Sequence, residues 1–287
     1  MKYLFFTIAF YWLVACQTPQ PSSDSKPVSI SNKGVNIVYD DTKTGDTALV
    51  FVHGWCINRG YWKDQVDFFK NRYRVVSVDL PGFGESGKNR TNWSVAEYGR
   101  DIDSVLSALD LRKVILVGHS MSGDIVLEAA INAPDRVLGI IGIDNFKGVG
   151  FVADSAYKKN FAAAMDSLRV HYTSLVTDYF NKELFYKTTD SAVRKRILSD
   201  VMHCDSVIAI DVIANAEFDE NSRIRNYGKT IYLVNSDYTP TDTAGFRKLD
   251  AHYDLVQIHA TGHYPMVEKP AEFNALLAES IRHLTKP

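Results

Sequence analysis

The sequence predicts an α/β fold: a mostly parallel sheet with helices on both faces and a helical segment inserted late in the chain. Three continuous apolar runs, each followed by loop residues and a helical pattern, carry this prediction. They are TALVFVHG at 47–54, YRVVSVDLPG at 73–82 and KVILVGHS at 113–120. Strands buried on both faces have such continuous apolar sequences, and helices between them form βαβ units with a parallel sheet.

Other elements of the predicted fold follow from local patterns. A β-hairpin is expected from residue 28, where VSISNKGVNIVYDDT alternates and then breaks at NKG. A helix is expected over 94–111, because Ser94 can cap its N-terminus and Glu97 follows three residues later. After a second helix, a further buried strand is predicted at 136–144.

A helical insertion separates the two halves of this sheet. Upstream of the strand-like run KTIYLVN at 229–235, a long stretch has helix-period patterns and no comparable apolar run. We expect this stretch, residues 146–215, to form a helical cap that determines substrate specificity. The core is then formed by 28–145 and 216–287, which include a last strand, YDLVQIHA, and a closing helix.

Length and composition are those of an ordinary globular protein. The 287 residues, 46% of them hydrophobic and 23% charged, suffice for one α/β domain with an insertion or for two small domains. The net charge of −2 lacks the basic character of nucleic-acid-binding proteins. We therefore expect a small-molecule substrate and no nucleic-acid partner, while the oligomeric state is left open.

The N-terminal residues are expected to lie outside the fold. MKYLFFTIAFYWLVAC has one lysine and then an apolar run that is too short to span a bilayer but suits a secretory signal peptide. We predict a signal peptide over 1–15 and a flexible tether, rich in Pro, Ser and Gln, over 16–27.

The end of this segment, LVAC at 13–16, resembles the lipobox of bacterial lipoproteins. That resemblance implies cleavage before Cys16 and a lipid on its thiol, which would anchor an exported protein to a membrane without a spanning helix. Gln17 in place of Asp favours the outer membrane by analogy with sorting rules. An ordinary signal peptide with a chance cysteine is the alternative.

The run at 113–120 ends in a serine-containing turn and passes directly into a helical pattern. Gly-x-Ser-x-small between a strand and a helix is typical of a nucleophile elbow, where the serine occupies a strained apex. Gly118 and Ser122 take the crowded positions on either side of Ser120, with Ser at the second position where Gly is usual. A nucleophile at Ser122 would instead place the bulkier Asp124 at a crowded position, so we predict Ser120.

In this order of motifs the chain resembles the α/β-hydrolase fold family, in the serine-nucleophile branch with a helical cap. The resemblance covers roughly residues 28–285, nearly all of the chain that follows the predicted tether. It rests on HGW at 53–55, DLPGFGES at 79–86, GHS at 118–120 and GH at 262–263. Each motif alone is weak, but the ordered set is specific, and it implies an α/β-hydrolase fold with a cap after the sixth strand.

A serine nucleophile needs a base within hydrogen-bond reach, and that base needs an orienting carboxylate. His263, in the Gly-His loop after the last strand, is the predicted base. The resemblance favours Asp237, after the preceding strand, as the carboxylate, which gives the order Ser, Asp, His. Asp144, at the end of the strand before the cap, is the rival, and Asp242 is a further candidate.

The resemblance also implies an oxyanion hole made by the backbone N–H groups of Trp55 and Met121. Serine at the elbow, where related epoxide hydrolases and haloalkane dehalogenases carry aspartate, favours acyl transfer to water. We therefore expect a serine hydrolase that cleaves an ester or related acyl bond of a small apolar substrate, with no cofactor and no metal. The alternatives are a lactone, thioester or carbon–carbon bond as the target of the same triad, or a non-catalytic binding protein on a hydrolase scaffold.

Two cysteines remain once Cys16 is set aside. The spacing of Cys56 and Cys204 fits no metal-binding pattern. We predict two buried or partly exposed thiols, neither of them a nucleophile, and a disulfide between them is the alternative that the sequence leaves open.

Overall fold

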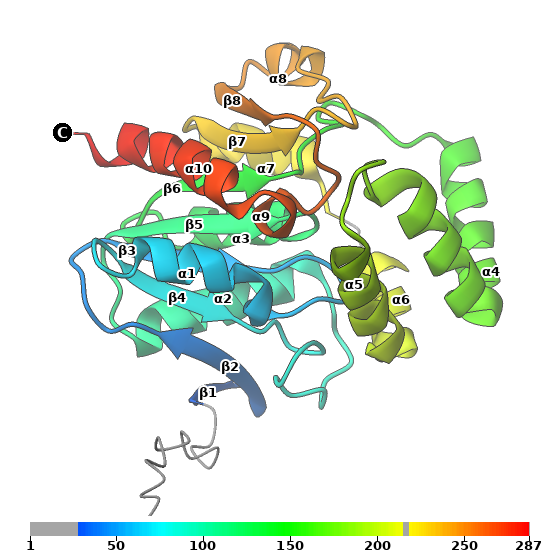
Figure 1. The fold of residues 1–287 in the computed structure, drawn as a ribbon, viewed down its shortest axis with the longest axis horizontal. Helices are drawn as coiled ribbons and strands as arrows, with labels where there is room; N and C mark the ends of the chain where they lie inside the picture. The colour runs from blue at the N-terminus through cyan, green and yellow to red at the C-terminus, as the bar shows by residue number, and fades with distance from the viewer. Residues whose placement is uncertain (1–27, 215–217, 287) are drawn as a thin grey trace, which may run out of the picture.

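An eight-stranded sheet forms the centre of the computed structural model, which describes residues 28–214 and 218–286 (Figure 1). The strands are β1 (Ser29–Asn32), β2 (Val35–Asp41), β3 (Ala48–Val52), β4 (Arg74–Val78), β5 (Val114–His119), β6 (Val137–Ile143), β7 (Ile231–Ser236) and β8 (Tyr253–Ile258). Their order is β1-β2-β4-β3-β5-β6-β7-β8. Along this order, all neighbouring strands from β4 through β3 to β8 are parallel, whereas β2 is antiparallel to both of its neighbours, β1 and β4. The predicted mostly parallel sheet is confirmed.

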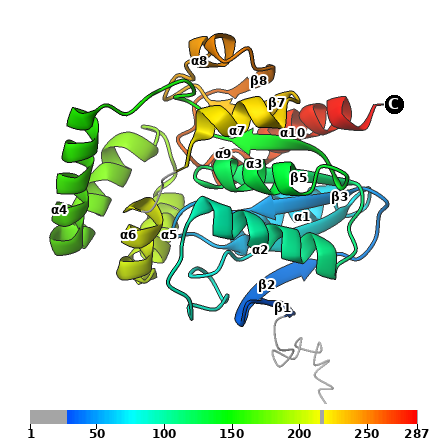
Figure 2. The same cartoon turned by 180° about the vertical axis from the view of Figure 1, so that it is seen from behind.

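Helices cover both faces of this sheet. They are α1 (Lys63–Phe69), α2 (Val95–Ala108), α3 (Ser122–Asn132), α7 (Glu220–Tyr227), α8 (Ala244–Lys248), α9 (Pro265–Glu268) and α10 (Pro270–Thr285). In Figure 1, α1, α9 and α10 lie in front of the sheet. Figure 2, the view from behind, shows α2, α3 and α7 on the opposite face. The class is therefore a layered α/β fold with a helical layer on each side of the sheet.

The strand and helix patterns of the sequence have direct structural causes. All residues of β3 and β5 are buried, which explains why their sequences are continuously apolar. At the start of α2, the Ser94 hydroxyl accepts a hydrogen bond of 3.3 Å from the N–H of Glu97. This helix ends at Ala108, three residues before the predicted end.

The segment between β6 and α7 is helical. It contains α4 (Ser155–Tyr179), the single π-helical turn η2 (Phe180–Leu184), α5 (Ser191–His203) and α6 (Ser206–Ala214). In Figure 1 these helices stand to the right of the sheet, and in Figure 2 they stand to its left, so they lie beyond one end of the strands. They fall within residues 146–215, where the sequence predicts a cap.

Helix α5 is attached to the core through the 3₁₀ turn η1 (Arg59–Trp62). The hydroxyl of Tyr61 donates a hydrogen bond of 2.6 Å to Asp200, and Arg196 donates one of 3.2 Å to the Gly60 carbonyl. The Arg196 guanidinium also stacks 4.1 Å from the centre of the Tyr61 ring. These contacts fix one helix of the inserted segment against the loop that follows β3.

The predicted signal peptide, tether and lipidated Cys16 lie at residues 1–27, outside the described residues. Among the helices that the structure does describe, none is both long and apolar enough to cross a membrane.

Candidate active site

Ser120 lies at the sharp turn between β5 and α3. Its backbone has φ of +53°, a left-handed conformation that is strained for a residue with a side chain. The turn is held from both sides, because the Ser120 N–H donates to the Ile143 carbonyl at 3.0 Å and its carbonyl accepts from the Gly123 N–H at 3.0 Å. The strained apex that the motif predicts is therefore present and fixed by its neighbours.

The residues on either side of this apex touch each other. A Cβ atom at Gly118 would lie 2.3 Å from the carbonyl oxygen of Ser122, so no larger residue fits there. Ser122 is completely buried, and its hydroxyl donates a hydrogen bond to the carbonyl of His53. Serine thus fits at the position where glycine is usual, and it ties the start of α3 to the loop after β3.

The structure brings His263 between Ser120 and Asp144. The His263 Nε2 lies 2.7 Å from the Ser120 hydroxyl, and its Nδ1 lies 2.5 Å from Asp144 Oδ2. The inserted segment holds the backbone of His263 in place, since the His263 N–H donates to the carbonyl of Leu184, the last residue of η2, at 2.8 Å. These contacts form an unbroken chain from a hydroxyl through an imidazole to a carboxylate.

The prediction of Asp237 as the partner of His263 is wrong. Strands β7 and β8 pair in register up to Ser236 and Ile258, so the next residues along, Asp237 and His259, face each other. Asp237 Oδ2 lies 2.6 Å from His259 Nδ1, and the side chain of Asp237 is 39% exposed. The rival acid, Asp144, occupies the position instead.

Asp242 also has a local role in the structure. Its carboxylate accepts a hydrogen bond of 2.9 Å from the N–H of Ala244, at the start of α8. Its own N–H donates to the carbonyl of Lys147 at 3.0 Å. It therefore closes a local turn just before α8.

Asp144 is held in its charged form. Burial alone would raise the pKa of this carboxyl, but the hydrogen bond and charge of His263 and the charge of Lys147 outweigh burial, and the pKa is lowered. The Lys147 ammonium lies 2.7 Å from Asp144 Oδ1, and it also donates to the carbonyl of Thr239 at 2.8 Å. Because Asp144 is ionised, it favours the His263 tautomer that carries its proton on Nδ1.

The sequence interpretation missed the contributions of Lys147 and Asn145. Asn145 donates from its side-chain amide to the carbonyls of Gly118 at 2.8 Å and Ser120 at 3.3 Å, and so fixes the elbow. Asn235 in turn donates to the Asn145 carbonyl at 2.9 Å. The signal in the sequence was position alone, because Asn145 directly follows Asp144 and Lys147 lies three residues after it.

His119 lies next to His263 and contacts its backbone. Burial, and next the charge of His263, lowers the pKa of His119 to about 3, so it is neutral at ordinary pH. Its Nε2–H therefore donates to the His263 carbonyl, at 2.8 Å. This contact helps to set the position of the His263 backbone.

The predicted oxyanion donors lie on two loops that meet at Ser120. A Cβ atom at Gly54 would lie 3.2 Å from the Cβ of Ser120, which shows how closely the loop after β3 approaches. Trp55 and Met121 both line the cavity beside Ser120. Within the described part of the chain, neither of their backbone N–H groups has a hydrogen-bond acceptor.

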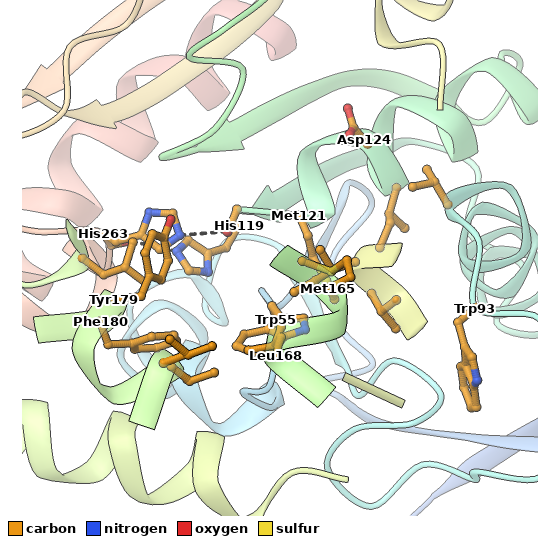
Figure 3. A pocket seen from close by; sticks show the side chains of 18 of the residues that line it. Trp55, Trp93, His119, Met121, Asp124, Met165, Leu168, Tyr179, Phe180 and His263 are labelled. Atoms are coloured by element: carbon orange, nitrogen blue, oxygen red, sulfur yellow. Dashed lines mark hydrogen bonds between the residues drawn. The ribbon is translucent and has the colours of Figure 1, made fainter. Parts of the chain in front are cut away.

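An apolar cavity of about 580 Å³ opens beside the Ser120 hydroxyl and the His263 ring (Figure 3). Its walls come from the core and from the helices between β6 and α7, and most of the lining side chains are hydrophobic. The labelled side chains include Trp55, Met121, Met165, Leu168 and Phe180. A site of this size and character suits the apolar part of a small molecule.

Comparisons with known proteins point to one family. The sequence matches the alpha/beta hydrolase fold family over residues 47–270. It is 23% identical over 282 residues to the dihydrolipoyllysine-residue acetyltransferase component of the acetoin cleaving system of Cupriavidus necator, covering 94% of this chain and 74% of that protein. A thermophilic esterase from Thermogutta terrifontis has a similar structure, with a TM-score of 0.77 and 21% identity over 91% of this chain and 100% of its own.

A second solved structure also has a fold similar to that of this chain. Est816, described as an N-acyl homoserine lactone degrading enzyme, has a TM-score of 0.76 and 23% identity over 88% of this chain and 99% of its own. At these identities the two structural likenesses show the fold. Together with the family match over most of the chain, they show that this protein belongs to the α/β-hydrolase fold family.

Proposed function

We propose that this protein is a serine hydrolase that cleaves an ester or related acyl bond through an acyl-enzyme intermediate. The observation that carries the proposal is the chain of hydrogen bonds from the Ser120 hydroxyl through His263 to Asp144. A hydroxyl becomes a useful nucleophile when a base can accept its proton as it attacks. The α/β-hydrolase family and the esterase fold neighbour support the same chemistry.

In the first half of the proposed reaction, Ser120 attacks the acyl carbon. His263 Nε2 accepts the hydroxyl proton, and Asp144 stabilises the positive charge that forms on the imidazole. The backbone N–H groups of Trp55 and Met121 would donate to the oxyanion, a contribution worth about 3 kcal/mol per donor in other hydrolases. His263 then gives its proton to the leaving group, and the acyl group stays on Ser120.

Water completes the reaction in the second half. His263 takes a proton from a water molecule, whose oxygen attacks the acyl carbon, and the same N–H groups stabilise the second oxyanion. Proton return to Ser120 releases the acid. A lactone is a cyclic ester, so it would be opened by the same steps, with its alcohol remaining part of the product.

The cavity supports an apolar substrate. Its hydrophobic walls would bind an acyl or alcohol chain without leaving polar groups unpaired, and Ser120 lies on its wall. We therefore propose a small, apolar ester as the substrate class. Turnover of a panel of esters with different acyl chains, and of lactones, would define the preferred acyl-chain length and lactone ring.

Ser120→Ala tests the proposed chemistry. We expect the variant to lose at least ~10³-fold in kcat on p-nitrophenyl acetate, because removal of a catalytic serine leaves only binding and oxyanion stabilisation. Ser86→Ala is a matched control, since Ser86 is a buried serine whose hydroxyl bonds the Asp79 carbonyl, away from this cavity. Full activity of Ser120→Ala, with the protein folded, would exclude the proposal.

We also propose that the protein is exported and held at a bacterial membrane by a lipid on Cys16. The support is the LVAC ending of the apolar N-terminal run. Cys16→Ser should move the protein from the membrane fraction to the soluble fraction on cell fractionation. Unchanged membrane retention of the variant would contradict the anchor.

A further inference from the structure

A second, smaller cavity lies between the core and the inserted helices. Its volume is about 180 Å³, and its walls include both Cys56 and Cys204. Cys56 directly follows Trp55 in the loop after β3, and Cys204 directly follows the last residue of α5. Two residues far apart in the sequence are thus brought to one place, on the two parts of the molecule that enclose the proposed active site.

The two thiols share their surroundings. The Cys56 sulfur lies 3.6 Å from the hydroxyl of Tyr172, and that hydroxyl also lies 3.3 Å from the carbonyl of Val201, in the last turn of α5. Both cysteines are free thiols in the structure. Tyr172 therefore links the Cys56 side of the cavity to the helix end that carries Cys204.

The two thiols differ in accessibility. Cys56 is 3% exposed, and its backbone has φ of +56°, so the loop holds it in a strained conformation. Burial, followed by the neighbouring Cys204 thiol, raises the pKa of Cys56 well above its usual value. Cys204 is only partly buried, so it is the thiol that a dissolved reagent would meet first.

We propose that Cys56 and Cys204 form a disulfide by exchange with a small-molecule disulfide such as oxidised glutathione. The Cys204 thiolate attacks one sulfur of the reagent, a mixed disulfide forms, and one thiol of the reagent leaves. Cys56 then loses its proton and attacks the Cys204 sulfur, which releases the second thiol. Two protein thiols are oxidised, and one reagent disulfide is reduced to two thiols.

The bond would join the end of α5 to the loop that carries Trp55. It would close a loop that runs from residue 56 to residue 204, and long loops gain the most from such a constraint on the unfolded chain. Formation of the bond does not depend on the proposed hydrolase activity. Any effect of the disulfide on catalysis does rest on the proposed function, because Trp55 supplies a proposed oxyanion donor. The indole N–H of Trp55 also donates to the Ala209 carbonyl of α6 at 2.9 Å.

The test uses the full chain, purified in detergent under reducing conditions and then incubated with oxidised glutathione at low protein concentration. Free thiols are blocked with an alkylating reagent before digestion without reductant. We expect a cross-linked pair of peptides that contain Cys56 and Cys204, lighter by two hydrogens than their sum, and Cys16 is identified on its own peptide. The midpoint temperature of thermal unfolding should rise by roughly 5 °C after oxidation and fall back to its original value when dithiothreitol is added.

Cys204→Ser and Cys56→Ser are the matched controls, and each should give neither the cross-linked peptides nor the reversible thermal shift. The proposal is overturned if both thiols of the wild-type chain are still alkylated after oxidation. It is also overturned if glutathione stays on Cys204, or if the link joins two chains. These outcomes are independent of the Ser120→Ala result, so failure of one proposal is distinguishable from failure of the other.

Discussion

Asp144→Asn is expected to lower kcat by about 10⁴-fold while leaving the fold intact. The amide is the same size as the carboxylate, but its NH₂ group can donate to His263 Nδ1 and so stabilise the wrong tautomer. Nε2 would then carry a proton and could no longer accept one from Ser120, 2.7 Å away. Steady-state kinetics on p-nitrophenyl acetate, with circular dichroism to check folding, measure this loss.

Asp237→Asn is the matched control for this prediction. Asp237 contacts His259 on an exposed edge of the sheet, so its loss should leave kcat within about twofold of wild type. If Asp237→Asn caused the large loss and Asp144→Asn did not, the acid in solution would differ from the one that the structure places beside His263.

Arg59→Met is expected to reduce the free energy of unfolding by about 3 kcal/mol. Arg59 binds the carboxylate of Asp79, whose side chain is fully buried after β4. Asp79 also accepts backbone N–H groups from Arg59 at 2.7 Å and Glu85 at 2.9 Å, which would remain in the variant. The substitution therefore leaves the buried carboxylate of Asp79 without its counter-ion but still hydrogen-bonded. The expected loss of stability is thus at the low end of the range for breaking a buried ion pair. Urea unfolding measures the difference.

Arg112→Met provides the comparison for an exposed ion pair. Arg112 contacts Asp110 at 2.8 Å, and both side chains are about 70% exposed. The same substitution there should change the free energy of unfolding by less than about 0.5 kcal/mol. If the two substitutions changed the free energy of unfolding equally, the buried ion pair between Arg59 and Asp79 would stabilise the fold no more than an exposed pair does.

The strands and the nucleophile elbow were predictable because their signals are local. Continuous apolar runs result from burial on both faces, and the small residues around Ser120 result from a direct contact between Gly118 and Ser122. His263 was predictable because it follows the last strand in a recognisable loop. Each of these features depends on residues that are close together in the sequence.

The acid was not predictable in the same way, because its identity depends on how far two neighbouring strands extend. Asp144 follows β6 and Asp237 follows β7, so both lie at the same end of the sheet. The pairing of β7 with β8 continues far enough to place Asp237 opposite His259, while Asp144 turns toward His263 with φ of +50°. The ammonium of Lys147 then joins Asp144 through a turn that no sequence pattern indicates.

The inserted helices show the same limit. Helical periodicity predicts helices between β6 and α7, but α4 departs from helical geometry at His171, where φ is −121° and ψ is 33°. No proline or glycine lies within this helix to mark the kink. The approach of Cys56 to Cys204 likewise depends on how α5 packs against the core.

The most direct test of the central claim is the site of covalent labelling by a fluorophosphonate probe. An activated serine with a base at 2.7 Å attacks such a probe, whereas an ordinary surface serine does not. Mass spectrometry of the digested protein should show one phosphonylated peptide, with the probe on Ser120, and no labelling in Ser120→Ala. An unlabelled protein, or a probe attached to another residue, would contradict the account.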